Sequence, residues 1–255
     1  MHWRDLLCRR RRQLLDRLGL NRGWFRELSD YHRGMTMQEF WVRYTVGRMD
    51  AATLWERKPR MTEADYRSFY GETAYFVLRQ MHYHRNSCFH FAAAAMRQAG
   101  LEGDFCEYGC GVAPITAWLR RRFPRWRYTL VDLPSPMLEF ARWRFRGLSH
   151  VETREPGYGS DLPLTRRYDV ITCLEVLEHV INPFEVVRHL TEHLKPGGAL
   201  FINFVDDPGG DENLTESAAQ RAETIEYLNR TLRPVVPLHG SGPDVIHGHY
   251  VKPAR

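Results

Sequence analysis

The hydrophobic pattern of the chain changes near residue 100. Upstream, apolar and aromatic residues recur at helical spacing, and no convincing strand alternation is found. Thr62, followed by acidic residues, is typical of a helix start, while Ser87 and Gly100 are typical of a start and a stop. This pattern predicts helices over residues 35–49, 62–85 and 87–100.

Downstream, short apolar runs alternate with amphipathic helical segments. The apolar runs predict strands over residues 104–109, 126–133, 168–174 and 199–205. The segments between them predict helices over residues 114–123, 135–146 and 182–194. Ser135 and Asn182 precede two of these helices, and each is followed by a proline suited to a first helical position. Repeated strand–helix alternation predicts an α/β fold, a Rossmann-like doubly wound and mostly parallel sheet. The glycine- and proline-containing segment 233–253 is interpreted as a terminal hairpin.

We therefore divide the chain into an N-terminal helical extension, residues 1–100, and an α/β domain, residues 101–255. An apolar fraction of 43% and an aromatic fraction of 13% predict a packed core rather than disorder. The net charge of +5 comes mainly from scattered arginines, so a nucleic-acid partner is not favoured. No apolar run approaches the about 20 residues that span a bilayer. Five cysteines without an export signal are interpreted as reduced thiols of a cytoplasmic protein.

A glycine-rich turn, EYGCGVAP at residues 107–114, joins the first expected strand to its helix. Gly109 and Gly111 allow a sharp turn and close approach of a ligand, and Asp132 ends the next strand. An acid at that place accepts hydrogen bonds from both hydroxyls of a ribose. In the alternative explanation, the glycines only make a tight turn and Asp132 caps the segment after it.

The same turn indicates which nucleotide would bind. A dinucleotide-binding turn would have a third glycine, where this chain has Ala113 followed by Pro114. Glu107 would repel a pyrophosphate but suits a ligand that carries an ammonium group. The turn therefore favours S-adenosylmethionine over NAD.

Four motifs in residues 103–205 resemble those of the class I S-adenosylmethionine-dependent methyltransferases. They are EYGCGVAP, LVDLP, YDVITCLEVLEHV and LKPGGALFI, in the family's order. The resemblance covers about 40% of the chain and leaves out the first hundred residues. It implies that residues 101–255 are a methyltransferase domain that binds S-adenosylmethionine. By this likeness the methionine end meets Glu107, Gly109 and Gly111; the ribose meets Asp132; Leu133 and Leu174 line the adenosine; and Asp161, or otherwise Glu155, meets the adenine amine.

The segment CLEVLEHVINP, residues 173–183, leaves three hypotheses open. In the first, Glu175 and His179 are the polar rim of the cofactor pocket. In the second, Glu175, Glu178 and His179 bind a divalent cation such as Mg²⁺, as similar segments do in ubiquinone-type O-methyltransferases and small-RNA 2′-O-methyltransferases. In the third, His179 is a catalytic base, with Glu175 as the other catalytic candidate.

The function favoured by these motifs is methyl transfer to a small-molecule acceptor, at oxygen. We expect aromatic residues of the N-terminal extension to cover the site, because water must be kept from the reacting methyl group. These residues are Tyr66, Tyr70, Tyr75, His82, Tyr83 and His84. Two alternatives are an RNA methyltransferase and a non-catalytic S-adenosylmethionine-binding partner subunit. A homodimer is compatible with each of them.

Overall fold

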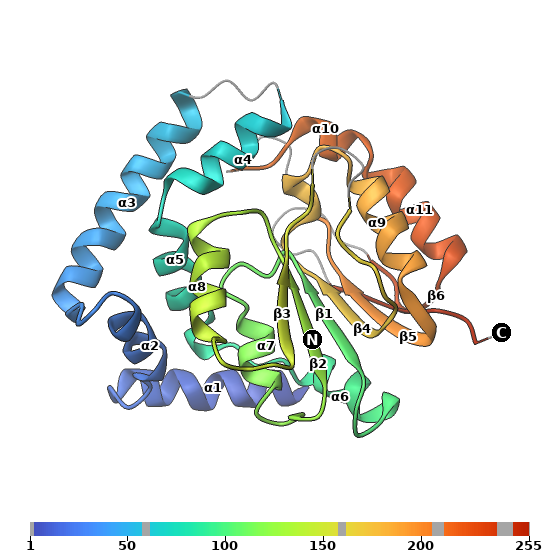
Figure 1. Ribbon diagram of the computed structural model, residues 1–255, viewed down its shortest axis with the longest axis horizontal. Coiled ribbons are helices and arrows are strands. Elements are labelled where there is room, and N and C mark those ends of the chain that lie inside the picture. Colours follow the sequence, from blue (N-terminus) through green and yellow to red (C-terminus); the bar gives the residue numbers. More distant parts are fainter. Residues whose placement is uncertain (1–2, 58–61, 158–161, 206–211, 239–246, 255) are drawn as a thin grey trace.

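The protein is an α/β fold built around one mixed sheet (Figure 1). The computed structural model describes residues 3–57, 62–157, 162–205, 212–238 and 247–254. Within them the sheet has seven strands in the order β3-β2-β1-β4-β5-β7-β6. The first five in this order are parallel, and β7 is antiparallel to both β5 and β6. The strands are β1 (Asp104–Tyr108), β2 (Arg127–Val131), β3 (Val151–Arg154), β4 (Tyr168–Cys173), β5 (Leu194–Ile202), β6 (Arg233–Val236) and β7 (Gly248–Val251).

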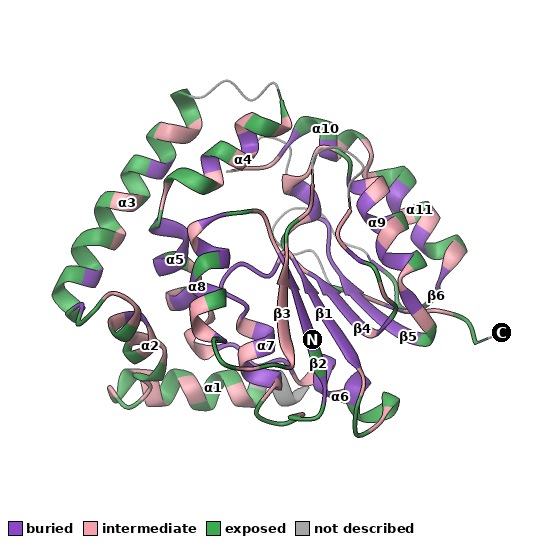
Figure 2. Cartoon of the chain, viewed as in Figure 1, coloured by how far each residue is buried: buried purple, intermediate pink, exposed green. Residues whose placement is uncertain are grey.

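Helices cover both faces of the sheet, so the Rossmann-like, mostly parallel fold expected from the sequence is confirmed. One face packs against α6 (His90–Ala99), α7 (Pro114–Leu119) and α8 (Pro136–Arg144). The other face packs against α9 (Pro183–Glu192) and α11 (Arg221–Thr231), with the short α10 (Thr215–Ala219) before α11. Apolar residues on both faces of the central strands are buried, as parallel strands between two helical layers require (Figure 2).

The remaining N-terminal helices form a further layer outside α8. They are α1 (Trp3–Arg17), α2 (Gly23–Tyr31), α3 (Met37–Arg57), α4 (Glu63–Glu72), α5 (Tyr75–Tyr83) and the 3₁₀ turn η1 (His84–Asn86). Helices α2, α4 and α5 contact α8, whereas α3 lies outermost and is largely exposed (Figures 1 and 2). Helix α6 packs on the sheet itself, so the expected division at residue 100 separates it from the core that it joins. None of the helices in the described ranges is both long and apolar enough to cross a membrane.

The helix starts expected from the sequence are partly confirmed. Thr62 makes a complete capping box with Asp65, and Ser135 accepts a hydrogen bond from the Leu138 N–H. Asn182 lies at the cap position of α9, but its side chain makes no capping bond. The expectation for Ser87 is wrong: α6 begins at His90, because residues 84–86 form η1 and the chain then extends before re-entering a helix.

Two strand pairings complete the sheet. Strand β3 was not among the expected strands, because four residues are too short a run to stand out in the sequence; in the structure all four are half-buried. It pairs with β2 and forms one edge of the sheet. The expected terminal hairpin is confirmed, with β6 and β7 pairing antiparallel.

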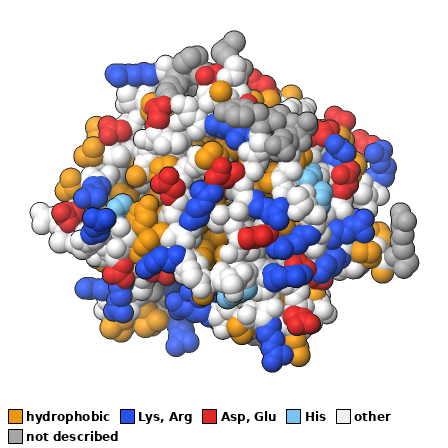
Figure 3. Space-filling view, viewed as in Figure 1, with side chains coloured by type: hydrophobic (Ala, Val, Ile, Leu, Met, Phe, Trp, Pro, Cys, Tyr) orange, Lys and Arg blue, Asp and Glu red, His pale blue; other side chains and the backbone are white. Residues whose placement is uncertain are grey.

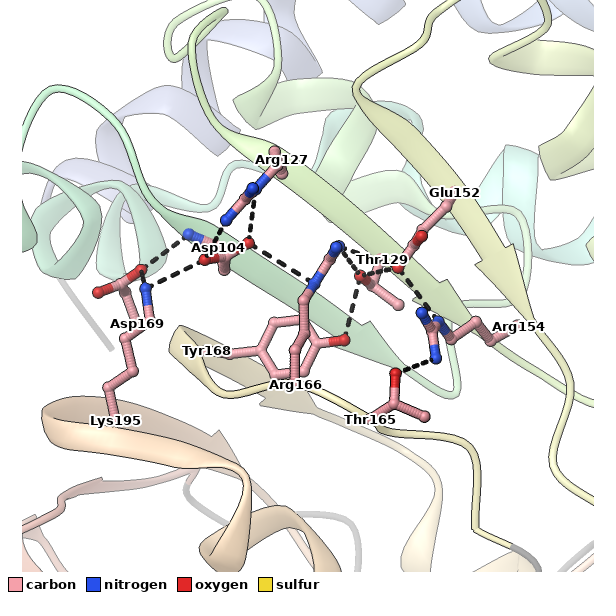
Figure 4. Close-up of polar contacts among 10 residues, drawn as sticks. All are labelled: Asp104, Arg127, Thr129, Glu152, Arg154, Thr165, Arg166, Tyr168, Asp169 and Lys195. Carbon is pink, nitrogen blue, oxygen red and sulfur yellow. Dashed lines mark hydrogen bonds and ion pairs between the residues drawn. The ribbon is translucent and has the colours of Figure 1, made fainter.

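A network of ion pairs joins the strands where they begin (Figure 4). Asp104 is 3% exposed and receives Arg127 at 2.9 Å and Lys195 at 3.0 Å, while Lys195 also reaches Asp169 at 2.7 Å. Burial raises the pKa of Asp104, but the hydrogen bonds from Arg127 and Lys195 outweigh it and lower the pKa below its usual value. The network fixes the amino ends of the strands, the edge opposite the glycine-rich turn.

The expectation of five reduced thiols is wrong for two of them. Cys8 of α1 and Cys88, just before α6, form a disulfide across 80 residues. Cys106, Cys110 and Cys173 are free and buried. The sequence alone could not reveal this pair, because only the fold brings α1 against the start of α6. Disulfides are rare in cytoplasmic proteins, so this bond counts against the expected location.

The disulfide gives a direct prediction for thiol counting. Titration with a thiol reagent in denaturant without reductant should find three thiols, the five in the sequence minus the two in the disulfide. A Cys8→Ser/Cys88→Ser variant should also lose about 2–4 kcal/mol of unfolding free energy, since the bond closes a long loop in the unfolded chain. Five titratable thiols in unreduced protein would contradict the bond.

Candidate functional site

The turn from β1 to α7 is a tight loop at the carboxyl end of the sheet. Gly109 and Gly111 have φ values of 68° and 50°, and Ala113 has 52°. Positive φ strains any residue with a Cβ, so the glycines are needed there and Ala113 carries a local cost. The turn is further fixed by the Cys110 N–H, which donates to the Val131 carbonyl at 2.9 Å. The turn and the end of β2 are thus one rigid unit.

Asp132 holds the turn from the neighbouring strand. Its carboxylate accepts hydrogen bonds from the Gly111 N–H at 2.5 Å and from the Leu133 N–H at 2.7 Å. Burial raises the pKa of Asp132 to about 6, although these two hydrogen bonds oppose the shift. Each oxygen accepts one of these bonds and can accept another, so the carboxylate can still bind two hydroxyl groups.

Glu107 makes contacts with α7 that the sequence did not predict. Its oxygens accept the Ile115 N–H at 3.1 Å and the Thr116 N–H at 2.8 Å, and the residue is 3% exposed. The carboxylate therefore satisfies the first turn of α7, whose N–H groups have no partner within the helix. Burial raises the pKa of Glu107 to about 7, against the hydrogen bonds from α7. Its contact with a methionine end remains a prediction; its observed role is to set the turn.

Two residues that sequence reasoning missed lie directly over the glycines. The side chain of Gln80, from α5, accepts the Val112 N–H at 2.9 Å and lies where a Cβ on Gly111 would be. Val176 occupies the corresponding space over Gly109. Neither residue has a motif signal, because Gln80 lies outside the α/β domain and Val176 is one more apolar residue in CLEVLEHV. A ligand approaching the turn must displace or contact both.

The three polar residues of CLEVLEHV do not converge. Glu175 has a φ of 57° and is exposed; its N–H donates to Asn203 Oδ1 at 2.7 Å, and its carboxylate accepts from the Asn203 amide. Glu178, by contrast, is 3% exposed. The left-handed backbone at Glu175 sends the two carboxylates to different environments.

Glu178 is a buried carboxyl whose Oε2 has no hydrogen-bond partner among the residues that the structure describes. Burial raises its pKa to about 8, and the nearby charge of Glu175 adds to the shift. Its Oε1 is 3.8 Å from His179 Nε2, beyond hydrogen-bond distance. Across the described part of the chain, no three His, Cys, Asp or Glu side chains are grouped to hold a metal ion. The expected set of Glu175, Glu178 and His179 does not fit a divalent cation.

His179 has a defined hydrogen-bond partner. Its Nδ1 lies 2.8 Å from the Glu212 carbonyl oxygen. Since a carbonyl only accepts, Nδ1 carries the hydrogen and Nε2 carries the lone pair. Burial lowers the pKa of His179 below its usual value, so the ring is neutral at pH 7. Nε2 can therefore accept a proton.

Only part of the expected aromatic cover lies at this site. The Tyr70 ring is 6.4 Å from that of His179, and burial raises the pKa of its hydroxyl well above the usual value, with the charges of Glu212, Asp132 and Glu178 adding to the shift. Tyr75 and His82 instead pack around Tyr44. Tyr66 is buried, Tyr83 is 74% exposed, and His84 stacks near Phe89.

Of the residues expected to contact the adenosine, the structure locates Leu133, Leu174 and Glu155. Leu133 directly follows Asp132, and Leu174 directly follows β4 and packs toward the α6 side of the sheet. Asp161 lies outside the described residues. Its alternative, Glu155, pairs with Arg142 at 2.5 Å. The contact with the adenine amine stays a prediction.

Comparisons with known proteins agree with this arrangement. A family profile described as "Methyltransferase domain" matches residues 106–200. Ubiquinone biosynthesis O-methyltransferase of Proteus mirabilis (strain HI4320) is 34% identical over 115 residues, 43% of this chain and 45% of that protein. The enzyme of the same name from Xanthomonas campestris pv. campestris (strain B100) is 27% identical over 138 residues, 49% of this chain and 50% of that protein. The chain thus spans about half the length of these relatives.

Among solved structures, the chain matches N-methyltransferase NodS from Bradyrhizobium japonicum WM9 in complex with S-adenosyl-L-homocysteine. It is 16% identical, covers 80% of this chain and 98% of its own, and has a TM-score of 0.46. The segment that the profile matches holds the turn, Asp132 and CLEVLEHV. Residues 106–200 thus match a methyltransferase domain, and the motifs they carry are those of the class I S-adenosylmethionine-dependent methyltransferases.

Proposed function

We propose that the protein transfers the methyl group of S-adenosylmethionine to an oxygen atom of a small-molecule acceptor. The observation that carries the proposal is the unit formed by the glycine turn and Asp132, at the carboxyl ends of β1 and β2. In parallel α/β sheets, ligands bind at this edge. Transfer to oxygen is supported by the curated relatives, which are named as O-methyltransferases.

The chain offers suitable groups for the cofactor. Asp132 would accept both ribose hydroxyls with its remaining lone pairs, and Leu133 and Leu174 would flank the adenosine. Glu107 would act indirectly, by holding α7 and the turn in place. Gln80 would release the Val112 N–H and turn its side-chain amide toward the methionine end of the cofactor. The cofactor supplies the methyl group that is transferred.

His179 is the residue that we propose as base. Its Nε2 lone pair would take the proton from an acceptor hydroxyl, and the Glu212 carbonyl would stabilise the Nδ1–H that remains. Tyr70 would help to exclude water from one side. Glu175, engaged with Asn203, would be a structural residue at the rim rather than a catalytic one.

An RNA acceptor is a weaker candidate. On the face shown in Figure 3, basic side chains lie in several separate places, interleaved with acidic ones, rather than in one stripe. A non-catalytic partner subunit would bind the cofactor without turnover. The activity assay below distinguishes such a subunit from a methyltransferase. A homodimer and a cytoplasmic location stay predictions.

The experiment measures S-adenosylhomocysteine released from S-adenosylmethionine with a panel of phenols and other hydroxylated metabolites. With an accepted substrate, His179→Gln should lower kcat about 10²–10⁴-fold, since a positioned base contributes that much. Its affinity for S-adenosylhomocysteine should be unchanged. His150→Gln, next to the amino end of β3, is the control and should keep full activity. Full activity in His179→Gln would refute the assigned base, and no release with any acceptor would favour the partner subunit.

A further inference from the structure

A cleft of about 600 Å³ lies between the N-terminal helices and α7. Its walls come from α1, α2, the α5–η1 corner, α7 and α8. It reaches the outer side of the glycine turn at Val112, but Asp132, Val176, Glu178 and His179 do not line it. The cleft is thus distinct from the strand-end site, and its size suits a small molecule.

The cleft carries an excess of positive charge. Five arginines line it, against the acidic residues Glu27 and Asp30. Arg85 is paired with Asp16, and Arg144 is paired with Glu27. The other three, Arg12, Arg26 and Arg121, form no ion pair with any residue that the structure describes.

Arg12 is the most constrained of these three. It is half-buried, and within the described ranges its guanidinium donates to the Ser87 carbonyl at 3.1 Å. Burial lowers the pKa of Arg12, and the nearby charges of Arg122 and Arg121 lower it further. A half-buried cation next to like charges is unfavourable, and an anion in the cleft would relieve that cost. His84 adds no charge, because burial lowers its pKa to about 4.

Large apolar and aromatic residues also line the cleft, beside the polar Asn21 and Ser87. They are Leu15, Trp24, Met81, Phe89 and Trp118. Ligand sites of this kind combine an apolar lining with a few charged groups that fix orientation. The charges alone would suit an inorganic anion, but this lining suits an anion with an apolar body.

The wall formed by α1 is fixed in advance. The Cys8–Cys88 disulfide, the Arg12 bond to Ser87 and the Arg85–Asp16 ion pair tie α1 to the segment before α6. After α1, Asn21 donates to Asn86 Oδ1 at 2.7 Å. Little ordering is then needed on binding, which favours affinity.

We propose that this cleft is a second binding site, for a small organic anion whose carboxylate or phosphate meets Arg12, Arg26 and Arg121 and whose apolar body lies against Trp24 and Trp118. The site also touches the turn, because Arg144, on its wall, donates to the Val112 carbonyl at 2.8 Å. A bound anion can therefore influence the turn that the proposed cofactor uses.

Titration calorimetry with the full chain at low salt tests the proposal. The probes are phenyl phosphate and benzoate, with benzyl alcohol as the neutral control. Phenyl phosphate or benzoate should bind at one site, and benzyl alcohol should not. Tighter binding of phenyl phosphate would indicate a phosphate ligand, and tighter binding of benzoate would indicate a carboxylate ligand.

Variants locate the binding. Arg26→Gln and Arg121→Gln should each weaken binding about tenfold, and both side chains are exposed, so the fold should persist. Arg10→Gln is the control, since Arg10 is on α1 and exposed but does not line the cleft. Equal weakening by all three variants would indicate general surface charge and overturn the proposal.

A competition experiment separates the cleft from the proposed cofactor site. Saturating S-adenosylhomocysteine should leave one equivalent of probe binding intact. If it abolishes that binding, the cleft is part of the cofactor site and the second site is refuted. This outcome is independent of methyl transfer, so failure of the cleft and failure of the proposed activity can be told apart.

Discussion

Replacing Asp132 with alanine is expected to weaken S-adenosylhomocysteine binding by about two orders of magnitude or more. Two effects add. Hydrogen bonds to a charged group contribute about 1.5–3 kcal/mol each, and the ribose would lose two of them. The Gly111 N–H would also lose its partner, so the turn would lose the contact that ties it to β2. Calorimetric titration of the purified variant measures the effect.

Two companion variants separate charge from structure. Asp132→Asn keeps the shape and can still accept the Gly111 N–H, so it should retain the fold and lose about tenfold in affinity, as expected for one charge-assisted bond. Asp50→Ala, exposed on α3, should change nothing. Unchanged affinity in Asp132→Ala would mean that the ribose binds elsewhere, and the proposed cofactor geometry would be wrong.

The stability of the protein should fall as the pH rises through the range set by Glu178. In the unfolded chain this carboxyl titrates near 4.5, and in the folded protein burial raises its pKa to about 8. Between these values the folded state holds a proton that the unfolded state has lost. Stability is therefore greatest below the unfolded pKa and falls until the folded pKa is passed. The slope is about 1.4 kcal/mol per pH unit, or about 3 kcal/mol between pH 5.5 and 9.

Glu178→Gln should remove this contribution, since glutamine does not titrate. Urea unfolding at pH 5.5 and pH 9 should show a smaller loss of unfolding free energy for the variant than for the parent protein. The other buried carboxyls, Glu107 and Asp132, keep their share of the pH dependence in both. Glu223→Gln, exposed on α11, should behave like the parent. An identical pH dependence in Glu178→Gln would mean that the carboxyl is ionised in the folded state.

The CLEVLEHV segment shows that a sequence motif does not by itself predict where its side chains lie. Three metal-competent residues within five positions suggest one site, because neighbours in sequence are neighbours in space. The backbone at Glu175 makes that inference wrong. Its φ of 57° leaves the Glu175 carboxylate exposed, while the Glu178 carboxyl is buried. No sequence pattern predicts a left-handed glutamate, because the bonds that hold it come from Asn203, which follows β5.

The sequence by itself determined the central parallel strands of the sheet, the glycine turn and the aspartate behind it. Each depends on local chemistry: apolar runs that must be buried on two faces, glycines that accept positive φ, and an acid that directly ends a strand. Only the tertiary structure decided that Gln80 covers the turn, that Glu107 caps α7, that Cys8 bonds Cys88 and that three arginines meet in one cleft. These features join residues from distant segments, and their partners are fixed by how helices pack, which no short stretch of sequence encodes.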